Sequence, residues 1–416
     1  MDAGKWLATA ATAARHAQQT LALTPHSKRD AALRAVANIL RERASEILLA
    51  NSRDLSAFSG SEAFRDRLTL NDPRIEAMAR GLEGIADLDD PLSRSLGEWT
   101  RPNGLIIRRV PSAIGVLAMI FESRPNVGID AAGLTLKSGN ALILRGGSES
   151  FHSSAVLIQA FRDGLRSADL PEDAVQMAPS SDRALVGEVL AAQGLIDLII
   201  PRGGKSLVER VQREARVPVL AHAEGLNHTY IHRSADPAMA QQIVINAKMR
   251  RPSICGATET LLIDREIAPS MLPGLIDSLA QLGCRFRADA RTRSLLPELP
   301  LATEADFRTE WQDAVLSIAQ VDGVDAAVAH INDYGSKHTD AIIAEDPVVA
   351  QRFLAGIGSA VGLWNASTQF SDGGEFGFGA EIGISTGHLH ARGPIGLEQL
   401  TTFRYIVEGK GQVRPL

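Results

Sequence analysis

The sequence predicts an α/β protein made of two doubly wound, Rossmann-like domains, each built around a parallel sheet. Short apolar runs alternate with helical patterns from residue 113 to residue 222, and a second alternating series runs from residue 258 to residue 366. This alternation is typical of βαβ units, in which a crossover joins two parallel strands. The length of 416 residues also exceeds what one hydrophobic core usually serves. Two or three packed units are therefore expected.

The first series provides the elements of one domain, and a helix precedes it. Residues 27–51 place their apolar side chains on one stripe, which predicts an amphipathic helix that covers a core. Strands are expected at 113–121, 140–147, 195–204 and 217–222, with helices at 153–165, 182–193 and 205–215. Crossovers of this length favour a doubly wound sheet.

The second series has its own supply of strands and predicts a second α/β domain. It runs through 258–264, a helix near 271–283, and segments at 314–321, 325–333, 340–345, 347–357 and 360–366. Residues 234–255 lie between the two series, so we expect them to cross from one domain to the other. The glycine-rich segment 367–394 suits a loop that wraps a site or a partner.

Composition and charge argue against several classes of function. The formal net charge is −6 and the pI is near 6.0, whereas a protein that binds a nucleic-acid backbone normally carries a basic excess. No run approaches the roughly 18 apolar residues that span a bilayer, and residues 1–20 lack the apolar core of a secretory signal. We therefore expect a soluble, cytoplasmic protein that binds neither nucleic acid nor membrane.

The chain contains two cysteines, too few for a disulfide framework, and both are expected to be reduced thiols. Cys255 follows two arginines and a predicted helix in the segment RRPSICGATE. Cationic groups and helix amides lower the pKa of a thiol, so this setting favours a nucleophile; a small buried hydrophobe is the competing interpretation. Cys284 has no such setting and is expected to be structural.

One glycine turn lies in the segment FESRPNVGIDAAGLTLKSGNALILRGGSES (121–150). Asn126 follows a strand end, where its side-chain amide can donate to an oxyanion. The second strand closes on Arg145, Gly146, Gly147 and Ser148, where glycines let the backbone approach a phosphate or a ribose. Asn and Gly also mark ordinary turns, so turns without a ligand are the alternative.

A second glycine turn lies in IIPRGGKSLVER (199–210), which contains GKS. A P-loop requires a glycine five residues before Gly204, and that position is Ile199, which argues against an ATPase or kinase of this class. A strand, the turn Arg202-Gly203-Gly204 and a helix N-terminus remain, and such a turn can receive a pyrophosphate through its free amides. No GxGxxG fingerprint occurs.

The histidines do not predict a metal site, because neither HExxH nor paired Cys/His spacing occurs among His222, His228, His232, His338, His388 and His390. Hydrogen bonding and contacts to anions are the roles expected of them. Arg250, Arg251 and Arg392 are either solvated surface charges or ligands for an acidic substrate near Cys255.

Together these segments resemble the aldehyde dehydrogenase superfamily, and more closely its γ-glutamyl phosphate reductase branch. The resemblance covers nearly the whole chain, through FESRPNV, LKSGNALILRGG, IPRGGKSLV, HAEGLNHTYI, INAKMRRPSIC, HINDYGSKHTDAII and FGFGAEIGISTGHLHARGPIGLEQLTTFRYI. It implies an NADP(H)-binding domain over 1–96 and 113–232 and a catalytic domain over 233–390. A hairpin at 97–112 and a C-terminal arm at 391–416 would join subunits. Since residues 1–96 do not resemble a kinase domain, the resemblance is expected to be to a stand-alone reductase and not to a fused bifunctional enzyme.

The resemblance also implies a reaction: NADPH-dependent reduction of L-glutamyl 5-phosphate to L-glutamate 5-semialdehyde through a cysteine thioester, in proline biosynthesis. Cys255 falls on the catalytic cysteine, and Asn126 falls on the residue that shares an oxyanion hole with the cysteine amide. The position of Ser148 often holds a glutamate in NAD-preferring relatives, and its loss suits a 2′-phosphate. The implied cofactor residues are Arg145, Gly146, Gly147, Ser148, Arg202, Gly203, Gly204 and Glu310, the last at the nicotinamide ribose. The implied substrate residues are Arg124, Lys137, His338, Thr339 and Arg392. A homo-oligomer and an association with glutamate 5-kinase are expected.

Departures from the family pattern keep two rival functions open. Hydrolytic aldehyde dehydrogenases carry a general-base Glu about 34 residues before the cysteine, where this chain has His222, with Glu224 close by. A thioester that forms from an acyl phosphate, and that inorganic phosphate cleaves in the reverse direction, needs no base to activate water. The absence of the Glu therefore favours the acyl-phosphate reaction. Asn227 replaces a Cys that is common in the branch, and Gly256 replaces a commoner Asn. The rivals are an oxidising aldehyde dehydrogenase and a catalytically silent binding or scaffold protein.

Overall fold

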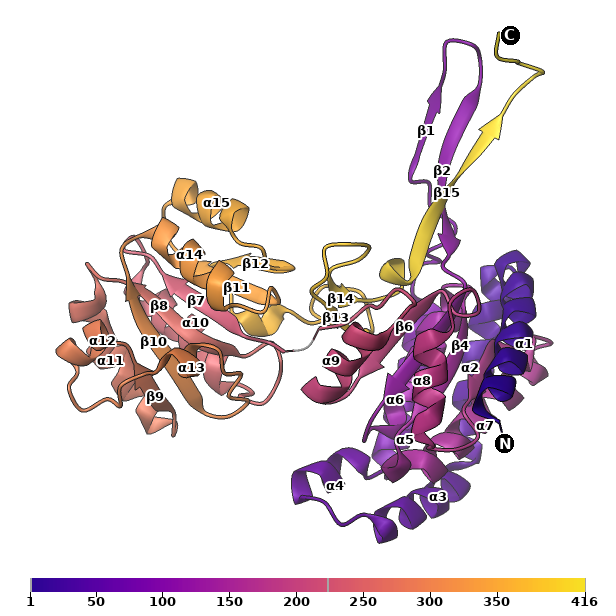
Figure 1. The fold of residues 1–416 in the computed structure, drawn as a ribbon, viewed down its shortest axis with the longest axis horizontal. Coiled ribbons are helices and arrows are strands. Elements are labelled where there is room, and N and C mark those ends of the chain that lie inside the picture. The colour runs from indigo at the N-terminus through magenta and orange to yellow at the C-terminus, as the bar shows by residue number, and fades with distance from the viewer. Residues whose placement is uncertain (1, 223, 416) are drawn as a thin grey trace. The chain divides into compact units, whose positions relative to one another are not determined.

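The computed structural model describes residues 2–222 and 224–415, and they form two compact units. The first unit contains the chain up to Ala221, Gly377–Gly383, and the residues from Ile395 onward. The second contains His222–Phe376 and Ile384–Pro394. Each unit is built on a parallel sheet with helices packed on both faces (Figure 1), so the predicted α/β class is confirmed. None of the described helices combines the length and apolar character that a membrane crossing requires.

The sheet of the first unit has the order β5-β4-β3-β6, and its neighbouring strands are all parallel. Its strands are β3 (Val116–Phe121), β4 (Ala141–Gly146), β5 (Val175–Met177) and β6 (Leu198–Arg202). Every residue of β3 and β4 is buried, because helices cover both faces of the sheet. This explains why both strands are nearly continuous apolar runs in the sequence.

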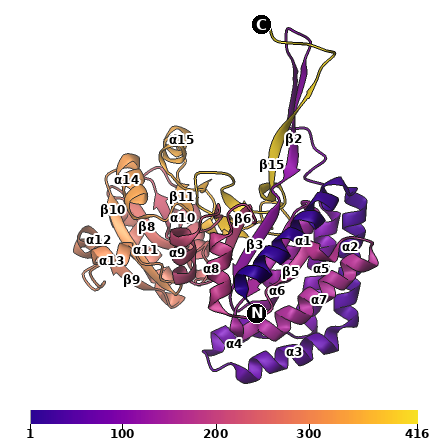
Figure 2. The same cartoon turned by 45° about the vertical axis from the view of Figure 1, so that its right-hand side comes forward.

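Helices pack on each face of this sheet. They are α1 (Ala3–Leu23), α2 (His26–Glu42), α3 (Ala44–Ala57), α4 (Glu62–Leu68), α5 (Asp72–Asp87), α6 (Pro125–Lys137), α7 (Phe151–Ser167), α8 (Arg183–Ala191) and α9 (Lys205–Glu214). On one face, α1 and α8 share a core with β3 and β4 (Figure 2). On the other, α7 approaches α2 so closely that a Cβ on Gly164 would lie 2.4 Å from Val36 Cγ2. Only glycine permits this approach.

A separate antiparallel sheet belongs to the first unit and has the order β1-β2-β15. Its strands are β1 (Gly97–Thr100), β2 (Ile106–Ala113) and β15 (Thr401–Glu408). β1 and β2 form a hairpin at the residues for which the sequence predicts one, and β15 pairs along the whole of β2. The ribbon stands away from the helices of its unit in Figures 1 and 2. Its exposed side chains include Trp99, Phe403, Tyr405 and Val407.

The second unit has a six-stranded, all-parallel sheet of order β12-β11-β7-β8-β10-β9. Its strands are β7 (Asn227–Ile231), β8 (Thr258–Asp264), β9 (Arg285–Ala288), β10 (Val315–Val321), β11 (Thr339–Ile343) and β12 (Val361–Trp364). Its helices are α10 (Pro237–Met249), α11 (Ala268–Gln281), α12 (Ala290–Leu295), α13 (Glu304–Phe307), α14 (Val324–Tyr334) and α15 (Pro347–Gly356). Side chains alternate between two cores, with α10 and α11 on one face and α14 and α15 on the other. Short strands β13 (Gly383–Ser385) and β14 (Gly393–Ile395) lie where the chain passes between units.

Three local expectations differ from the structure. The helix expected over residues 27–51 is two helices, because the backbone at Arg43 leaves the helical region and ends α2 before α3 begins. The strand expected at 217–222 is an isolated bridge between Val219 and Ile199. The chain enters the second unit at His222, earlier than the expected crossing at 234–255 or the domain boundary after residue 232, because β7 pairs with β8 and β11.

Candidate active site

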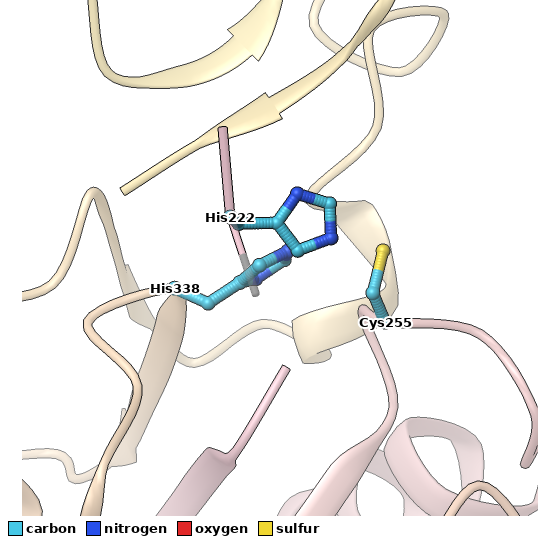
Figure 3. A group of neighbouring side chains, drawn as sticks. All are labelled: His222, Cys255 and His338. Carbon is cyan, nitrogen blue, oxygen red and sulfur yellow. The ribbon is translucent and has the colours of Figure 1, made fainter. Parts of the chain in front are cut away.

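The amino edge of the second sheet gathers three side chains that are far apart in the sequence. All strands of this sheet run in the same direction, so the residues that precede β7, β8 and β11 lie at one edge. His222 precedes β7, Cys255 precedes β8, and His338 directly precedes β11. One nitrogen of each histidine and the Cys255 sulfur all lie within 4.8 Å of one another. Figure 3 shows the His222 ring turned toward the sulfur of Cys255.

Asn227 holds the loop that carries Cys255. Its Nδ2 donates to the carbonyl oxygens of Cys255, at 2.6 Å, and of Ala257, at 2.9 Å. Its Oδ1 accepts from the backbone N–H of Thr339 at 3.2 Å, and the side chain is fully buried. Gly225 lies against the same loop, because a Cβ there would be 2.2 Å from the Cys255 carbonyl oxygen. Cys255 is therefore half-buried on a loop whose backbone is held from β7 and β11.

A buried ion pair braces the two ends of the same loop. Lys248, near the end of α10, donates to Glu259 on β8 at 2.6 Å, and both side chains are almost completely buried. Glu259 also accepts from the backbone N–H of Gln312 at 3.2 Å. Burial raises the pKa of Glu259 to about 7, and the neighbouring Lys248 opposes that rise. This pair was not predicted from the sequence. The sequence does place Lys248 at the end of a helix and Glu259 at the start of a strand, one on each side of the cysteine loop.

The hydrogen bonds of the two histidines define their tautomers. Nδ1 of His222 lies 2.9 Å from the carbonyl oxygen of Ile384, so Nδ1 is the donor in that bond. Nδ1 of His338 lies 2.9 Å from Thr339 Oγ1, and that hydroxyl donates to Ser371 Oγ at 2.9 Å. Nδ1 of His338 is therefore also the donor.

The free nitrogen of His338 is buried. Its Nε2 has no hydrogen-bond partner among the described residues, and the whole residue is inaccessible to solvent. Burial, with a smaller contribution from His222, lowers the pKa of His338 well below its ordinary value, so the ring is neutral at physiological pH. The site thus presents a thiol beside the imidazole of His222 and the buried, neutral imidazole of His338.

The other predicted residues of this unit have structural contacts as well. Glu310 Oε1 accepts from the backbone N–H of Gly225 at 2.9 Å, next to the Cys255 loop. Arg392 Nη2 donates to the carbonyl oxygen of Gly358 at 2.6 Å. The structure therefore brings Cys255, His338, Thr339 and Glu310 to one edge of the sheet, and it gives Arg392 a backbone partner on the segment before β12. Cys284 belongs to the α10–α11 core, and burial raises its pKa to about 11.

The predicted cofactor residues of the first unit lie at the carboxyl edge of its sheet. β4 and β5 lie on one side of β3, and β6 lies on the other. The order in which strands are added to the sheet therefore reverses at the boundary between β3 and β6. Ligands of doubly wound sheets bind at the carboxyl ends of strands at such a reversal. The turn Arg202-Gly203-Gly204 ends β6 and leads into α9, and Arg145-Gly146-Gly147-Ser148 ends β4.

Details of these turns fit a dinucleotide. A Cβ on Gly204 would meet nothing within 4 Å, but the backbone N–H of Gly204 donates to Glu122 Oε2 at 3.1 Å, so a phosphate that used this amide would have to displace the Glu122 carboxylate. Arg145 is buried, donates to the Ser181 carbonyl oxygen at 2.6 Å, and its Nε has no partner among the described residues. Glu149 follows Ser148, and its carboxylate accepts from the backbone N–H of Ser123 at 2.7 Å.

The remaining predicted residues of the first unit lie on or before α6. Asn126 is half-buried in its first turn, and its Nδ2 donates to Asp130 Oδ2 at 3.3 Å. Burial raises the pKa of Asp130 to about 6, although the Asn126 bond opposes it. Arg124 is the exposed N-cap residue of α6. Lys137 is buried at the other end of α6 and donates to Asp30 at 2.5 Å and to the Ala86 carbonyl oxygen at 3.0 Å. These two partners satisfy its buried ammonium group within the first unit.

Comparisons with known proteins identify the family. A model of the aldehyde dehydrogenase family matches residues 4–293. Proteins named gamma-glutamyl phosphate reductase from Acidiphilium cryptum and Gluconobacter oxydans are 65% and 63% identical, covering 98% and 99% of this chain and 97% of each relative. This chain belongs to the gamma-glutamyl phosphate reductase branch of the aldehyde dehydrogenase family. The family resemblance inferred from the sequence is confirmed.

Solved structures agree with this assignment. The crystal structure of gamma-glutamyl phosphate reductase from Thermotoga maritima is 40% identical, with a TM-score of 0.97 over 98% of this chain and 100% of the other. An acetylating aldehyde dehydrogenase from Geobacillus thermoglucosidasius is 18% identical, with a TM-score of 0.68 over 100% and 98% of the two chains, and shows the common fold. The predicted aldehyde dehydrogenase-like fold is therefore confirmed. Membership of this family supports a nicotinamide cofactor.

Proposed function

We propose that this chain reduces L-glutamyl 5-phosphate to L-glutamate 5-semialdehyde and phosphate with NADPH, the second step of proline biosynthesis from glutamate. The observation that carries the proposal is the position of Cys255, half-buried on a braced loop with one nitrogen of each of two imidazoles within 4.8 Å. Relatives named gamma-glutamyl phosphate reductase, at 65% and 63% identity, support the choice of substrate.

Cys255 is the nucleophile in this proposal. Nε2 of His222 accepts the thiol proton, and the sulfur attacks the acyl carbon of the substrate. The bond between that carbon and the phosphate oxygen breaks, a thioester forms, and the departing phosphate takes up the proton. The Asn126 side-chain amide and the Cys255 backbone N–H stabilise the oxyanion that forms during the attack. Neither step requires a water-activating carboxylate, which agrees with the presence of His222 where hydrolytic relatives have glutamate.

The cofactor residues would hold NADPH at the carboxyl edge of the first sheet. The N-terminus of α9, at Gly204, would receive the pyrophosphate in place of the Glu122 carboxylate, and Arg145 and Ser148 would hold the adenosine ribose. When bound, the nicotinamide would supply the hydride that reduces the thioester, and Glu310 would hold its ribose. The thiohemiacetal on Cys255 then releases the aldehyde as the carbon–sulfur bond breaks and the thiolate returns.

Preference for NADPH over NADH depends on charge around the 2′-phosphate. Ser148 carries no carboxylate, and the neighbouring Glu149 is engaged with the Ser123 amide and hydroxyl, at 2.7 and 3.0 Å. Arg145 remains as the nearby cation. A 2′-phosphate therefore meets less repulsion here than beside a glutamate at position 148.

Substrate and partner assignments complete the proposal. Arg124 and Arg392 are the proposed contacts to the anionic substrate, His338 and Thr339 support the site from its buried side, and the buried contacts of Lys137 give that residue a structural role. The exposed apolar side chains and unpaired edge of β15 suit a homo-oligomer. Association with glutamate 5-kinase, which would hand over a labile acyl phosphate, and a cytoplasmic location are further parts of the prediction.

The test is a pair of cysteine variants. Cys255→Ala removes the nucleophile and should abolish reduction while NADPH still binds, as measured by quenching or transfer of cofactor fluorescence. Cys284→Ala is the matched control, because Cys284 is a buried core thiol, and it should retain turnover. Substantial turnover by Cys255→Ala would overturn the proposal.

A further inference from the structure

We propose that His222, Cys255 and His338 form a binding site for Zn²⁺, and that occupation of this site reversibly inhibits the enzyme. The three residues are supplied by separate segments, before β7, β8 and β11, so their sequence spacing shows no metal motif. The binding stands on the geometry alone. The inhibition rests on the proposed function, in which Cys255 is the nucleophile.

The donor set matches what zinc prefers. Thiolate sulfur and imidazole nitrogen are its usual protein ligands, at about 2.3 and 2.0–2.1 Å, and three protein ligands with one open position describe many accessible zinc sites. In a tetrahedral site those bond lengths place neighbouring ligand atoms roughly 3.3–3.7 Å apart. The three atoms here lie within 4.8 Å of one another. A contraction of at most about 1.5 Å is therefore needed, and rotation of the Cys255 side chain about its first torsion moves the sulfur by more than that.

Each imidazole already has the outer contact that a metal-bound histidine requires. Ligating histidines donate their second ring N–H to a carbonyl, carboxylate or water, which fixes the ring and the tautomer. His222 donates from Nδ1 to the Ile384 carbonyl oxygen at 2.9 Å. His338 donates from Nδ1 to Thr339 Oγ1 at 2.9 Å, and Thr339 donates onward to Ser371 at 2.9 Å. Both rings are thus held with Nε2 as the lone-pair nitrogen.

The buried Nε2 of His338 is the second, independent observation. A buried polar atom without a partner costs free energy, and native structures rarely leave one unexplained. This nitrogen is inaccessible, has no hydrogen-bond partner among the described residues, and belongs to the ligand cluster. A metal ion bound by it would satisfy the atom, whereas the thiol alone offers only a weak donor.

Binding of Zn²⁺ would stop the reaction for a simple reason. The metal takes the Cys255 sulfur as a thiolate and releases its proton, so the electron pair that attacks the acyl carbon is committed to the metal–sulfur bond. It also occupies Nε2 of His222, the proposed proton acceptor. No bond of the protein is oxidised or broken, so a chelator restores activity.

The binding test uses Cd²⁺ and Co²⁺ as spectroscopic probes of the metal-free full-length protein. A thiolate-to-metal charge-transfer band with Cd²⁺, and visible bands of tetrahedral Co²⁺, are expected in the wild type and absent in Cys255→Ser. His222→Gln and His338→Gln should each weaken binding by more than the roughly 10–100-fold that loss of an outer contact produces. Thr339→Val, which removes the outer contact of His338, should fall within that range. Cys284→Ser and His16→Gln, a surface change on α1, are matched controls and should bind as the wild type does.

The inhibition test measures reductase turnover against free Zn²⁺, with recovery by EDTA. Weaker inhibition in both histidine variants, in step with their weaker Cd²⁺ binding, is expected. Because His338 is buried, a thermal unfolding curve checks the fold of His338→Gln, and the half-buried His222→Gln supplies the same test independently. If both histidine variants bound the metal as tightly as the wild type, the histidines would not be ligands, and the metal would be bound by the Cys255 thiol alone. A protein that binds Cd²⁺ as predicted but has no reductase activity without metal would refute the proposed function and retain the site.

Discussion

The Asn227 side chain is expected to control both the stability of the second unit and the reactivity of Cys255. Asn227→Ala removes two bonds to the carbonyl oxygens of Cys255 and Ala257 and one bond from the Thr339 N–H, at 2.6, 2.9 and 3.2 Å. A net loss of about 1 kcal/mol for each bond, with a further 1–3 kcal/mol for a partner left buried and unsatisfied, gives a loss of roughly 4–6 kcal/mol in the free energy of unfolding. In a unit of this size each kcal/mol lowers the melting temperature by about 2–4 °C.

The catalytic effect follows from the position of the loop. Displacement of a reacting group by about 1 Å typically costs on the order of 100-fold in rate. We therefore expect single-turnover reduction and alkylation of Cys255 by iodoacetamide to slow in Asn227→Ala, with the KM for NADPH unchanged. A purely structural role would lower the melting temperature and leave the rate per folded molecule as it is.

Asn227→Asp is the matched variant. It keeps the size and the acceptor oxygen but replaces the donor with an oxygen that faces two carbonyl oxygens, so it should be at least as unstable as Asn227→Ala at neutral pH. If Asn227→Asp melts and turns over like the wild type, the bonds to the Cys255 loop do not matter and this reasoning is wrong.

Three further changes test other parts of the account. Gly225→Ala places a Cβ 2.2 Å from the Cys255 carbonyl oxygen and should lower kcat by on the order of 100-fold in a steady-state assay, whereas Gly187→Ala, with nothing within 4 Å, should not. Ser148→Glu should lower the ratio of kcat/KM for NADPH over NADH by about 10-fold, from roughly 1–2 kcal/mol of repulsion at an exposed site, and Ser148→Ala should leave the ratio unchanged. The folded pKa of Glu259 is about 7, above its ordinary 4.5, so its contribution to stability is complete below about pH 4.5 and is lost as the pH rises through 7. Urea unfolding of Glu259→Gln should therefore depend less on pH between 5 and 8 than that of the wild type.

The results that contradict these three are equally specific. Normal turnover by Gly225→Ala would mean that the loop yields to a Cβ without consequence. An unchanged cofactor ratio in Ser148→Glu would place the 2′-phosphate elsewhere. Identical pH profiles for the wild type and Glu259→Gln would show that this carboxyl group titrates alike in the folded and unfolded chains.

Much of the fold was predictable because buried parallel strands leave a strong signal. The apolar runs at 258–264 and 314–321 correspond closely to β8 and β10, which are shielded on both faces. β7 escaped prediction because its sequence, NHTYI, is polar, and its buried polar groups are satisfied by specific partners such as Asp340 and Asp264. Periodicity cannot reveal a strand whose burial depends on hydrogen bonds.

The candidate site was predictable in part. The motif around Cys255 predicts a nucleophile and His338 was expected to contact an anion, and both roles stay predictions. The contacts that hold Cys255 come from Asn227, Gly225 and the Lys248–Glu259 pair, which only the parallel register brings to its loop. Asn227 was noted as a departure from the branch, but its three bonds depend on β7 lying between β8 and β11. Sequence spacing also gave no sign that His222, Cys255 and His338 meet.

The most direct test of the central claim is the reverse reaction, followed as NADPH formation from L-glutamate 5-semialdehyde and NADP⁺. Oxidation should require inorganic phosphate, because phosphate must cleave the thioester on Cys255, and it should be lost in Cys255→Ala. Oxidation at the same rate without phosphate would mean that water resolves the thioester, and the chain would then act as an oxidising aldehyde dehydrogenase.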